Sequence, residues 1–245
     1  MNYFIGSLYG NKAAYEAVKE KLNLKKTDTL WILGDAMDGE SCDPIECVEM
    51  LEDIARQPNI KFVIGDHEFA HIMCYISQEN KESYDSWKDY SLSLTQPSYE
   101  MIEFLENEIS EDLRDALFSY LIQNCEISHL IKIGDNFFYI THGFPCRYTG
   151  NMTSWQFQTV ANTPDDIDFL PAIKTDPCAK EFLPHLTTDN TFVICSNALP
   201  KGIYQGEGSI YHGKGVFVLN TDICENQIPV LGIDAAGYFF KNIVF

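Results

Sequence analysis

Five acidic and histidine side chains follow short apolar runs of the sequence, in positions suited to metal binding. They are Asp35, Asp38, Asp66, His67 and His142. Two carboxylates and one imidazole, from Asp35, Asp66 and His142, form a mixed oxygen and nitrogen ligand set that suits Mn, Fe or Zn. We predict that these three side chains converge on one divalent cation, with His67 and Asp38 beside it. The alternative is that they cap turns or hydrogen-bond within the core, and that no metal binds.

A second pattern overlaps this set. Residues 67–71 read His-Glu-Phe-Ala-His and match H-E-x-x-H, the helical zinc motif of metallopeptidases. In that motif both histidines lie one turn apart on one helix face. His67 comes directly after an apolar run, so we expect it at the start of a helix rather than inside one. A zinc peptidase is therefore the least favoured interpretation.

The first third of the chain alternates between predicted strands and helices. The order is strand, helix, strand, helix, strand, at 2–6, 11–22, 29–34, 44–55 and 61–65. This alternation favours an α/β sheet with right-handed crossovers. Ligands bind beyond the carboxyl ends of the strands in such sheets. The candidate residues should therefore meet at one sheet edge.

Helices dominate the predicted middle of the chain, and strands dominate its last part. Helices are expected at 68–78, 98–109 and after an N-cap at Ser110, with a polar stretch at 79–97. Further strands are expected at 127–133, 137–141, 192–195, 215–220, 229–233 and 238–244. We expect one domain over 1–245, with a helical excursion at about 68–124 and an irregular excursion at about 146–190.

The segments after the predicted strands resemble a known family, the phosphoprotein-phosphatase branch of the calcineurin-like metallophosphoesterases. This branch includes bacterial serine/threonine phosphatases and symmetrical diadenosine tetraphosphatases. Its motifs are Asp-x-His, Gly-Asp-x-x-Asp-Arg-Gly, Gly-Asn-His-Glu, His-Gly and Gly-His-Thr. The corresponding stretches are YFIGSLYGN, LGDAMDGE, IGDHE, ITHGFP and VICSNALP. The resemblance implies a four-layer α/β sandwich, in which two mixed β-sheets are flanked by helices.

The resemblance also implies a two-metal site, of which this sequence keeps one part. Asp35, Asp66 and His142 match three ligands of the second metal. The remaining ligand positions are degenerate, and they are Ser7, Tyr9 and Ser196. A neutral serine is a poor ligand, and a tyrosine would have to ionise from a pKa of about 10.

The proton-transfer pair of the family is retained. By resemblance, His67 donates a proton to the leaving group and Asp38 orients it, which is worth roughly 10²–10⁴-fold in rate. The phosphate-clamping arginine is replaced by Gly39. Arg147, five residues after His142, is the stand-in by position.

Two functions follow from this resemblance. The first is a phosphatase with an incomplete dimetal site and weak or altered activity on a phosphorylated small molecule or phosphoprotein. The alternative is a catalytically inactive pseudo-phosphatase that binds an unknown protein partner. Ligands of both metals and the arginine are lost together, which favours impaired activity.

The charge of the chain limits its partners. It has 17 Lys and Arg against 36 Asp and Glu, a net charge of −19, and this excludes nucleic-acid backbones and anionic membrane surfaces. The sequence contains no run of 18 apolar residues and no signal-peptide pattern at its start. We therefore expect a cytoplasmic protein whose 8 cysteines are reduced thiols.

Overall fold

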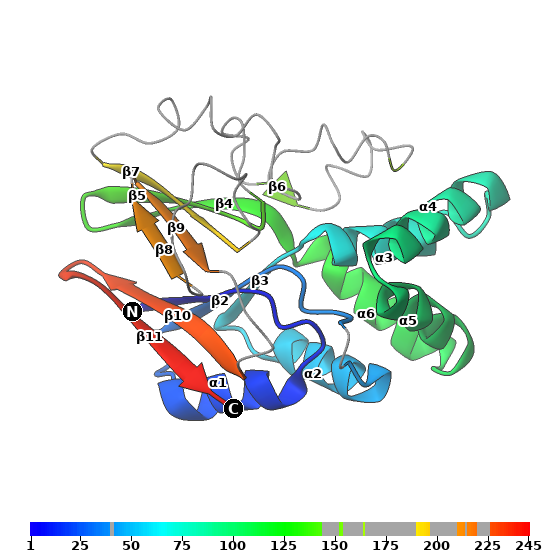
Figure 1. The fold of residues 1–245 in the computed structure, drawn as a ribbon, viewed down its shortest axis with the longest axis horizontal. Helices are drawn as coiled ribbons and strands as arrows, with labels where there is room; N and C mark the ends of the chain where they lie inside the picture. The colour runs from blue at the N-terminus through cyan, green and yellow to red at the C-terminus, as the bar shows by residue number, and fades with distance from the viewer. Residues whose placement is uncertain are drawn as a thin grey trace.

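The computed structural model describes most of the chain (Figure 1). The described residues are 1–39, 42–143, 152–153, 164, 190–196, 210–213, 215–219 and 226–245. The irregular excursion predicted at 146–190 lies outside them, apart from 152–153, 164 and 190. Arg147 also lies outside the described residues, so its role as a phosphate ligand remains a prediction.

The predicted alternation of strands and helices is confirmed in the first third of the chain. The elements are β1 (Asn2–Ile5), α1 (Lys12–Leu22), β2 (Thr29–Leu33), α2 (Pro44–Arg56) and β3 (Ile60–Val63). Side-chain caps fix where both helices begin. Asn11 accepts the amide N–H of Ala14, and Asp43 accepts the amide of Ile45 at the start of α2.

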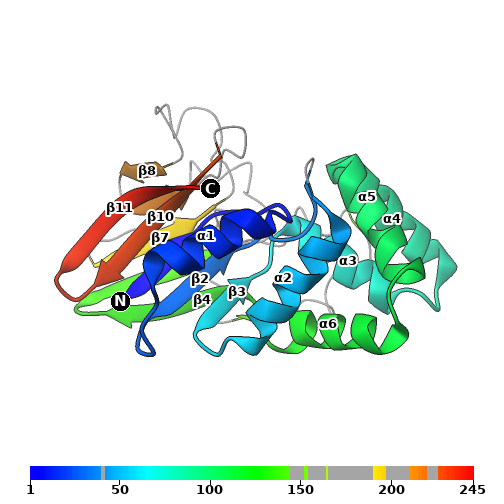
Figure 2. The same cartoon turned by 90° about the horizontal axis from the view of Figure 1, so that it is seen from below.

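Four helices follow and form a cluster at one end of the sheet (Figures 1 and 2). They are α3 (Asp66–Ile76), α4 (Lys81–Leu94), α5 (Gln96–Asn107) and α6 (Glu111–Gln123). Ser110 caps α6 as predicted, whereas the polar stretch at 79–97, for which no helix was predicted, contains α4. Trp87 and Ser91 are the buried residues of α4, and most of its other residues are polar, so the helix was not recognised in the sequence. None of the described helices has the length and apolar character needed to span a bilayer.

The described strands form one mixed, eleven-stranded sheet in the order β11-β10-β1-β2-β3-β4-β5-β7-β9-β8, with β6 paired to β4. The later strands are β4 (Glu126–Ile133), β5 (Asn136–Thr141), β6 (Met152–Thr153), β7 (Thr191–Cys195), β8 (Ile210–Gly213), β9 (Val216–Leu219), β10 (Gln227–Asp234) and β11 (Gly237–Val244). Of these, β6 and β8 were not predicted. The sequence prediction placed the other six strands correctly to within one or two residues.

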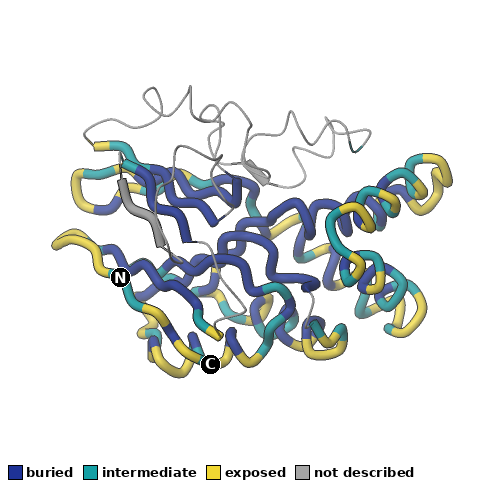
Figure 3. The backbone as a smooth tube through the Cα atoms, viewed as in Figure 1, coloured by how far each residue is buried: buried dark blue, intermediate teal, exposed yellow. Residues whose placement is uncertain are grey.

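The sheet curls so that its two halves pack face to face, as an α/β sandwich requires. Phe4 and Trp31 contribute to the inner core between the halves, together with Ile140 from β5. Their chain neighbours Ile5 and Ile32 point the other way, into the core beneath the helices. The two sheets expected from the sequence are the two halves of one continuous sheet, because β3 and β4 are hydrogen-bonded to each other. Figure 3 shows buried strands inside and exposed helix surfaces outside.

Candidate metal centre

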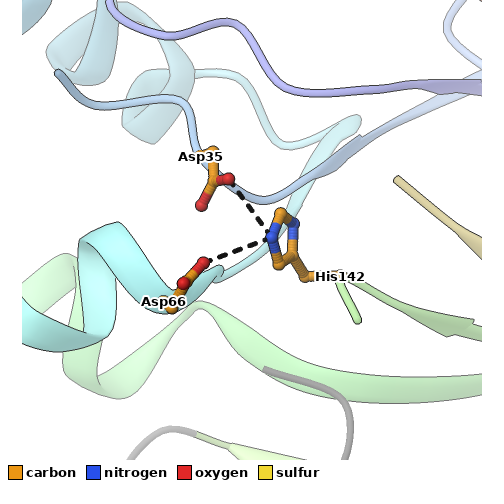
Figure 4. Close-up of side chains that lie close together, drawn as sticks. All are labelled: Asp35, Asp66 and His142. Carbon is orange, nitrogen blue, oxygen red and sulfur yellow. Dashed lines mark ion pairs between the residues drawn. The ribbon is translucent and has the colours of Figure 1, made fainter. Parts of the chain in front are cut away.

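Three of the sequence-predicted site residues meet beyond the carboxyl ends of the strands. Asp35 lies just after β2, Asp66 is the first residue of α3 after β3, and His142 follows β5. Strands β2 and β3 run parallel, so their carboxyl ends open at the same sheet edge. Figure 4 shows the three side chains pointing toward one another from these separate segments.

The three side chains are close enough to share one cation. The Nε2 atom of His142 lies 3.2 Å from Oδ2 of Asp35 and 3.5 Å from Oδ1 of Asp66. One ligand atom from each residue lies within 4.8 Å of the other two, and all three residues are buried. Asp35, Asp66 and His142 therefore lie together, as their positions after strand ends predict.

The ring of His142 is oriented from behind by the β2 backbone. Its Nδ1 atom lies 2.7 Å from the carbonyl oxygen of Leu33, which can only accept, so Nδ1 carries a hydrogen. The Ser196 hydroxyl also donates to this carbonyl and lies 2.9 Å from Nδ1. Ser196 therefore supports the His142 ring on the side opposite Asp35 and Asp66. Such support fixes the orientation of a histidine ligand.

The electrostatics of the cluster favour a positive charge at its centre. Burial lowers the pKa of His142, but the carboxylates of Asp35 and Asp66 outweigh burial and raise this pKa well above its usual value. The same interactions with His142 lower the pKa of Asp66 against the effect of burial. A proton on His142 or a bound cation would each compensate the paired carboxylates.

The donor set fits a divalent cation. The Oδ1 atom of Asp35 is buried and has no hydrogen-bond partner within the described residues. A Cβ atom at Gly65 would lie 2.1 Å from this oxygen, and one at Gly34 would lie 2.4 Å from Nδ1 of His142. Gly34 also has φ +83°, which favours glycine. Two carboxylates and one imidazole match Mn, Fe or Zn, and the two carboxylate charges balance such an ion.

Glu68 organises the backbone around the site, a role that the sequence argument missed. The amide N–H groups of Asp35, Met37 and Gly65 all donate to its carboxylate at 2.8–2.9 Å. Burial and the charge of Asp35 raise the pKa of Glu68 to about 7, against the lowering effect of the amides of Met37 and Gly65. The one sign of this role in the sequence was that Glu68 follows His67 in the H-E-x-x-H pattern.

A second cluster joins the predicted proton-transfer residues to His71. The Asp38 carboxylate, which is fully buried, accepts hydrogen bonds from Nδ1 of His67 and Nε2 of His71. Burial raises the pKa of Asp38, but the two histidines outweigh burial and hold it well below its usual range. Burial lowers the pKa of His67, whereas Asp35 and Asp38 raise it to about 10.

This second cluster explains the H-E-x-x-H pattern without zinc. Both histidine rings bond the same carboxylate, Asp38, and Glu68 binds backbone amides. His67 is the second residue of α3, at the helix start as expected. The zinc-peptidase arrangement, with both histidines directed at one ion, is not formed in the described part of the chain.

Comparisons with known proteins identify the fold. The sequence matches no protein-family model and no curated protein. Among solved structures, a hypothetical protein from Pyrococcus horikoshii aligns with a TM-score of 0.54 at 14% identity, over 100% of this chain and 89% of that chain. A metallophosphoesterase from Sphaerobacter thermophilus aligns with a TM-score of 0.51 at 17% identity, covering 100% and 88%.

A protein serine/threonine phosphatase from Saccharomyces cerevisiae also aligns, with a TM-score of 0.50 at 12% identity, covering 100% of this chain and 79% of that chain. The chain has the calcineurin-like metallophosphoesterase fold. These identities establish the fold alone, so the chemistry must be argued from the site of this chain.

On the metallophosphoesterase fold, Ser7 and Tyr9 occupy the loop after β1, beside the site. Ser7 is buried, and the Tyr9 ring lies edge-on to the His67 ring at 6.3 Å. Burial raises the pKa of the Tyr9 hydroxyl, and the charge of Asp35 raises it further. Tyr9 is therefore a neutral phenol rather than a phenolate ligand.

Proposed function

We propose that the protein is a phosphoesterase that acts with one divalent cation, held by Asp35, Asp66 and His142. The observation that carries this proposal is the convergence of these three buried side chains, within 4.8 Å, around an unpartnered oxygen of Asp35. The fold supports this proposal, because a metallophosphoesterase and a protein serine/threonine phosphatase of known structure share it. The proposed substrate is a phosphate monoester on a small molecule or a phosphoprotein.

The residues of this chain divide the chemistry between two clusters. A divalent cation at the first cluster would supply Lewis-acid stabilisation of the phosphoryl charge. The second cluster handles a proton. His67 gives its Nδ1 hydrogen bond to Asp38, so its Nε2–H is the group left to protonate a leaving oxygen. The side chain of His67 keeps 10% of its surface exposed, so the ring is not fully enclosed.

The residues at positions 7, 9 and 39 lead us to expect slow turnover. Ser7 and Tyr9 are neutral, and glycine at position 39 cannot provide the bidentate contact that arginine makes with phosphate. Less positive charge therefore faces a phosphate dianion than in a complete two-metal site. We propose weak or altered phosphatase activity for this reason.

The activity is tested with p-nitrophenyl phosphate and Mn²⁺. Wild-type protein should turn over the substrate only with the cation. Asp35→Asn should lose turnover together with Mn²⁺ binding, whereas His67→Asn should lose turnover and keep Mn²⁺ binding. Asp85→Asn is the control, because Asp85 is exposed on α4 away from the site. Full activity in either site variant would refute the assigned roles.

A second candidate, a catalytically inactive scaffold that binds a protein partner, is favoured by one observation. Ser196 stands at a ligand position of the resemblance, yet its hydroxyl is engaged by the Leu33 carbonyl behind His142. Absence of both Mn²⁺ binding and turnover in wild-type protein would select this candidate over the enzyme.

A further inference from the structure

His71 is a buried histidine with one nitrogen bonded and the other unpartnered. It lies on α3 with 1% of its surface exposed, and its Nε2–H donates to Oδ2 of Asp38. The Oδ1 atom of the same carboxylate binds His67. The Nδ1 atom of His71 is buried and has no hydrogen-bond partner in the described part of the chain. Buried polar atoms of this kind usually bind water or a ligand.

A small cavity adjoins His71 inside the helical cluster. It lies among α3, α5 and α6 and is lined by His71, Cys74, Tyr75, Leu105, Glu106 and Arg114, with other residues. The space open to the centre of a water molecule is ≈ 10 Å³. A volume of about 10–15 Å³ on this measure holds one water. The cavity therefore has room for one water molecule.

Arg114 offers this cavity a second unpartnered nitrogen. Its Nε atom is buried without a hydrogen-bond partner among the described residues, and Oδ1 of Asp115 lies 4.0 Å from it. This distance is too long for a hydrogen bond. Nε–H is a donor, and Nδ1 of His71 is an acceptor when Nε2 carries the hydrogen. A water that reaches both nitrogens would accept from Arg114 and donate to His71.

We propose that His71 is a positioning residue that holds Asp38, and through it His67, while one buried water molecule between His71 and Arg114 fixes the His71 ring. This proposal deepens the phosphoesterase function and rests on it for its catalytic consequence. Asp38 is fully buried at φ +39°, a strained conformation for this residue. Loss of the His71 bond would leave a buried carboxylate oxygen unsatisfied, so Asp38 would turn and release His67.

The consequence is that the helical cluster contributes to the active site. Arg114 on α6 orients the water. Both His67 and His71 lie on α3, and Asp38 lies in the loop after β2. Removing an outer partner of this kind typically reduces activity by about 10–100-fold. We expect kcat to fall by this factor when the His71 donor is lost. Mn²⁺ affinity should stay within about twofold, because the cluster of Asp35, Asp66 and His142 does not bond His71.

The test compares His71→Gln, which keeps an N–H donor directed at Asp38, with His71→Leu, which removes it. Long-range ¹H–¹⁵N spectra of the His67 ring are recorded alongside kcat and Mn²⁺ titrations. The glutamine variant should retain the wild-type His67 spectrum and most of kcat. The leucine variant should change the spectrum and lose kcat. A leucine variant with wild-type spectrum and kcat would overturn the proposal.

Wild-type protein provides a test that needs no variant to fold. Its spectrum should show hydrogen on Nε2 of His71, and Arg114→Met should shift the Nδ1 resonance through the lost water contact. An Nε2 atom without hydrogen, or an Nδ1 resonance unchanged in Arg114→Met, would overturn the proposal. If wild-type protein neither binds Mn²⁺ nor turns over substrate, the phosphoesterase function fails. The His67 spectrum of His71→Leu still decides whether His71 positions Asp38.

Discussion

His142 Nε2 lies 3.2 Å from Asp35 Oδ2, while the opposite nitrogen of the same ring is bound to the backbone of β2. The ring is thus held in place by a strand whose end also carries the carboxylate that it faces. The contact is an ion pair when His142 is protonated, and a cation between the two groups would take the place of that proton.

Cation binding should therefore release a proton. Burial lowers the pKa of His142, but Asp35 and Asp66 raise it well above its usual value, so the ring is protonated at neutral pH without a metal. Metal ligation requires the neutral imidazole. Mn²⁺ affinity should therefore rise with pH through the neutral range and level off only above the raised pKa of His142. Calorimetry in buffers of different ionisation enthalpy measures the proton release, and a pH-independent affinity without release would contradict the expectation.

A methyl group at position 65 should destroy the cation site. In Gly65→Ala the new Cβ would lie 2.1 Å from Oδ1 and 2.9 Å from the backbone nitrogen of Asp35. We expect loss of Mn²⁺ binding and destabilisation by about 1–3 kcal/mol, measured by calorimetry and urea unfolding. The matched control is Gly237→Ala, which strains a backbone at φ +149° in open space and should leave Mn²⁺ binding intact.

His67 should remain protonated above neutral pH in metal-free protein. Burial lowers its pKa, but Asp35 and Asp38 raise it to about 10. Because the folded-state pKa lies above the unfolded value of about 6.5, this stabilisation is complete below that value and is lost as pH rises toward 10. NMR titration of the ring and unfolding curves measure both effects. In Asp38→Asn the pKa should fall, and titration of wild-type His67 near its ordinary value would be inconsistent with the Asp38 bond.

Glu68 should contribute more to the free energy of unfolding than a carboxylate on the surface does. Glu68→Gln replaces an acceptor of three backbone amides with a group that presents its own donor to Asp35, Met37 or Gly65. We expect a loss of about 1–3 kcal/mol in the free energy of unfolding, measured by urea titration. Glu49→Gln, at an exposed ion pair with Lys12, should change it by about 0.5 kcal/mol or less. Equal effects of the two substitutions would refute the amide-anchoring role.

The convergence of three side chains could be predicted from the sequence, because the ends of strands are visible in it. Asp35, Asp66 and His142 each follow an apolar run, and sheet topology brings those ends together. The same reasoning placed five of the six helices in the described chain. It missed α4, whose sequence is mostly polar and which buries few residues, among them Trp87 and Ser91.

The contacts that tune the site were not predictable in this way. His71 was visible only as the second histidine of H-E-x-x-H, and its bond to Asp38 depends on how α3 packs against the loop after β2. Ser196 matched a ligand position, yet its hydroxyl binds the Leu33 carbonyl behind His142. Side-chain pairings of this kind arise from tertiary approach, and no local pattern encodes them.

The central claim is that this chain holds one divalent cation at Asp35, Asp66 and His142. Titration of chelator-treated protein with Mn²⁺ by calorimetry, checked by elemental analysis, tests it most directly. We predict about one Mn²⁺ per chain in wild-type protein, and none in Asp66→Asn or His142→Ala at the same concentration. Two ions per chain, no binding at saturating Mn²⁺, or undiminished binding in both variants would contradict the claim.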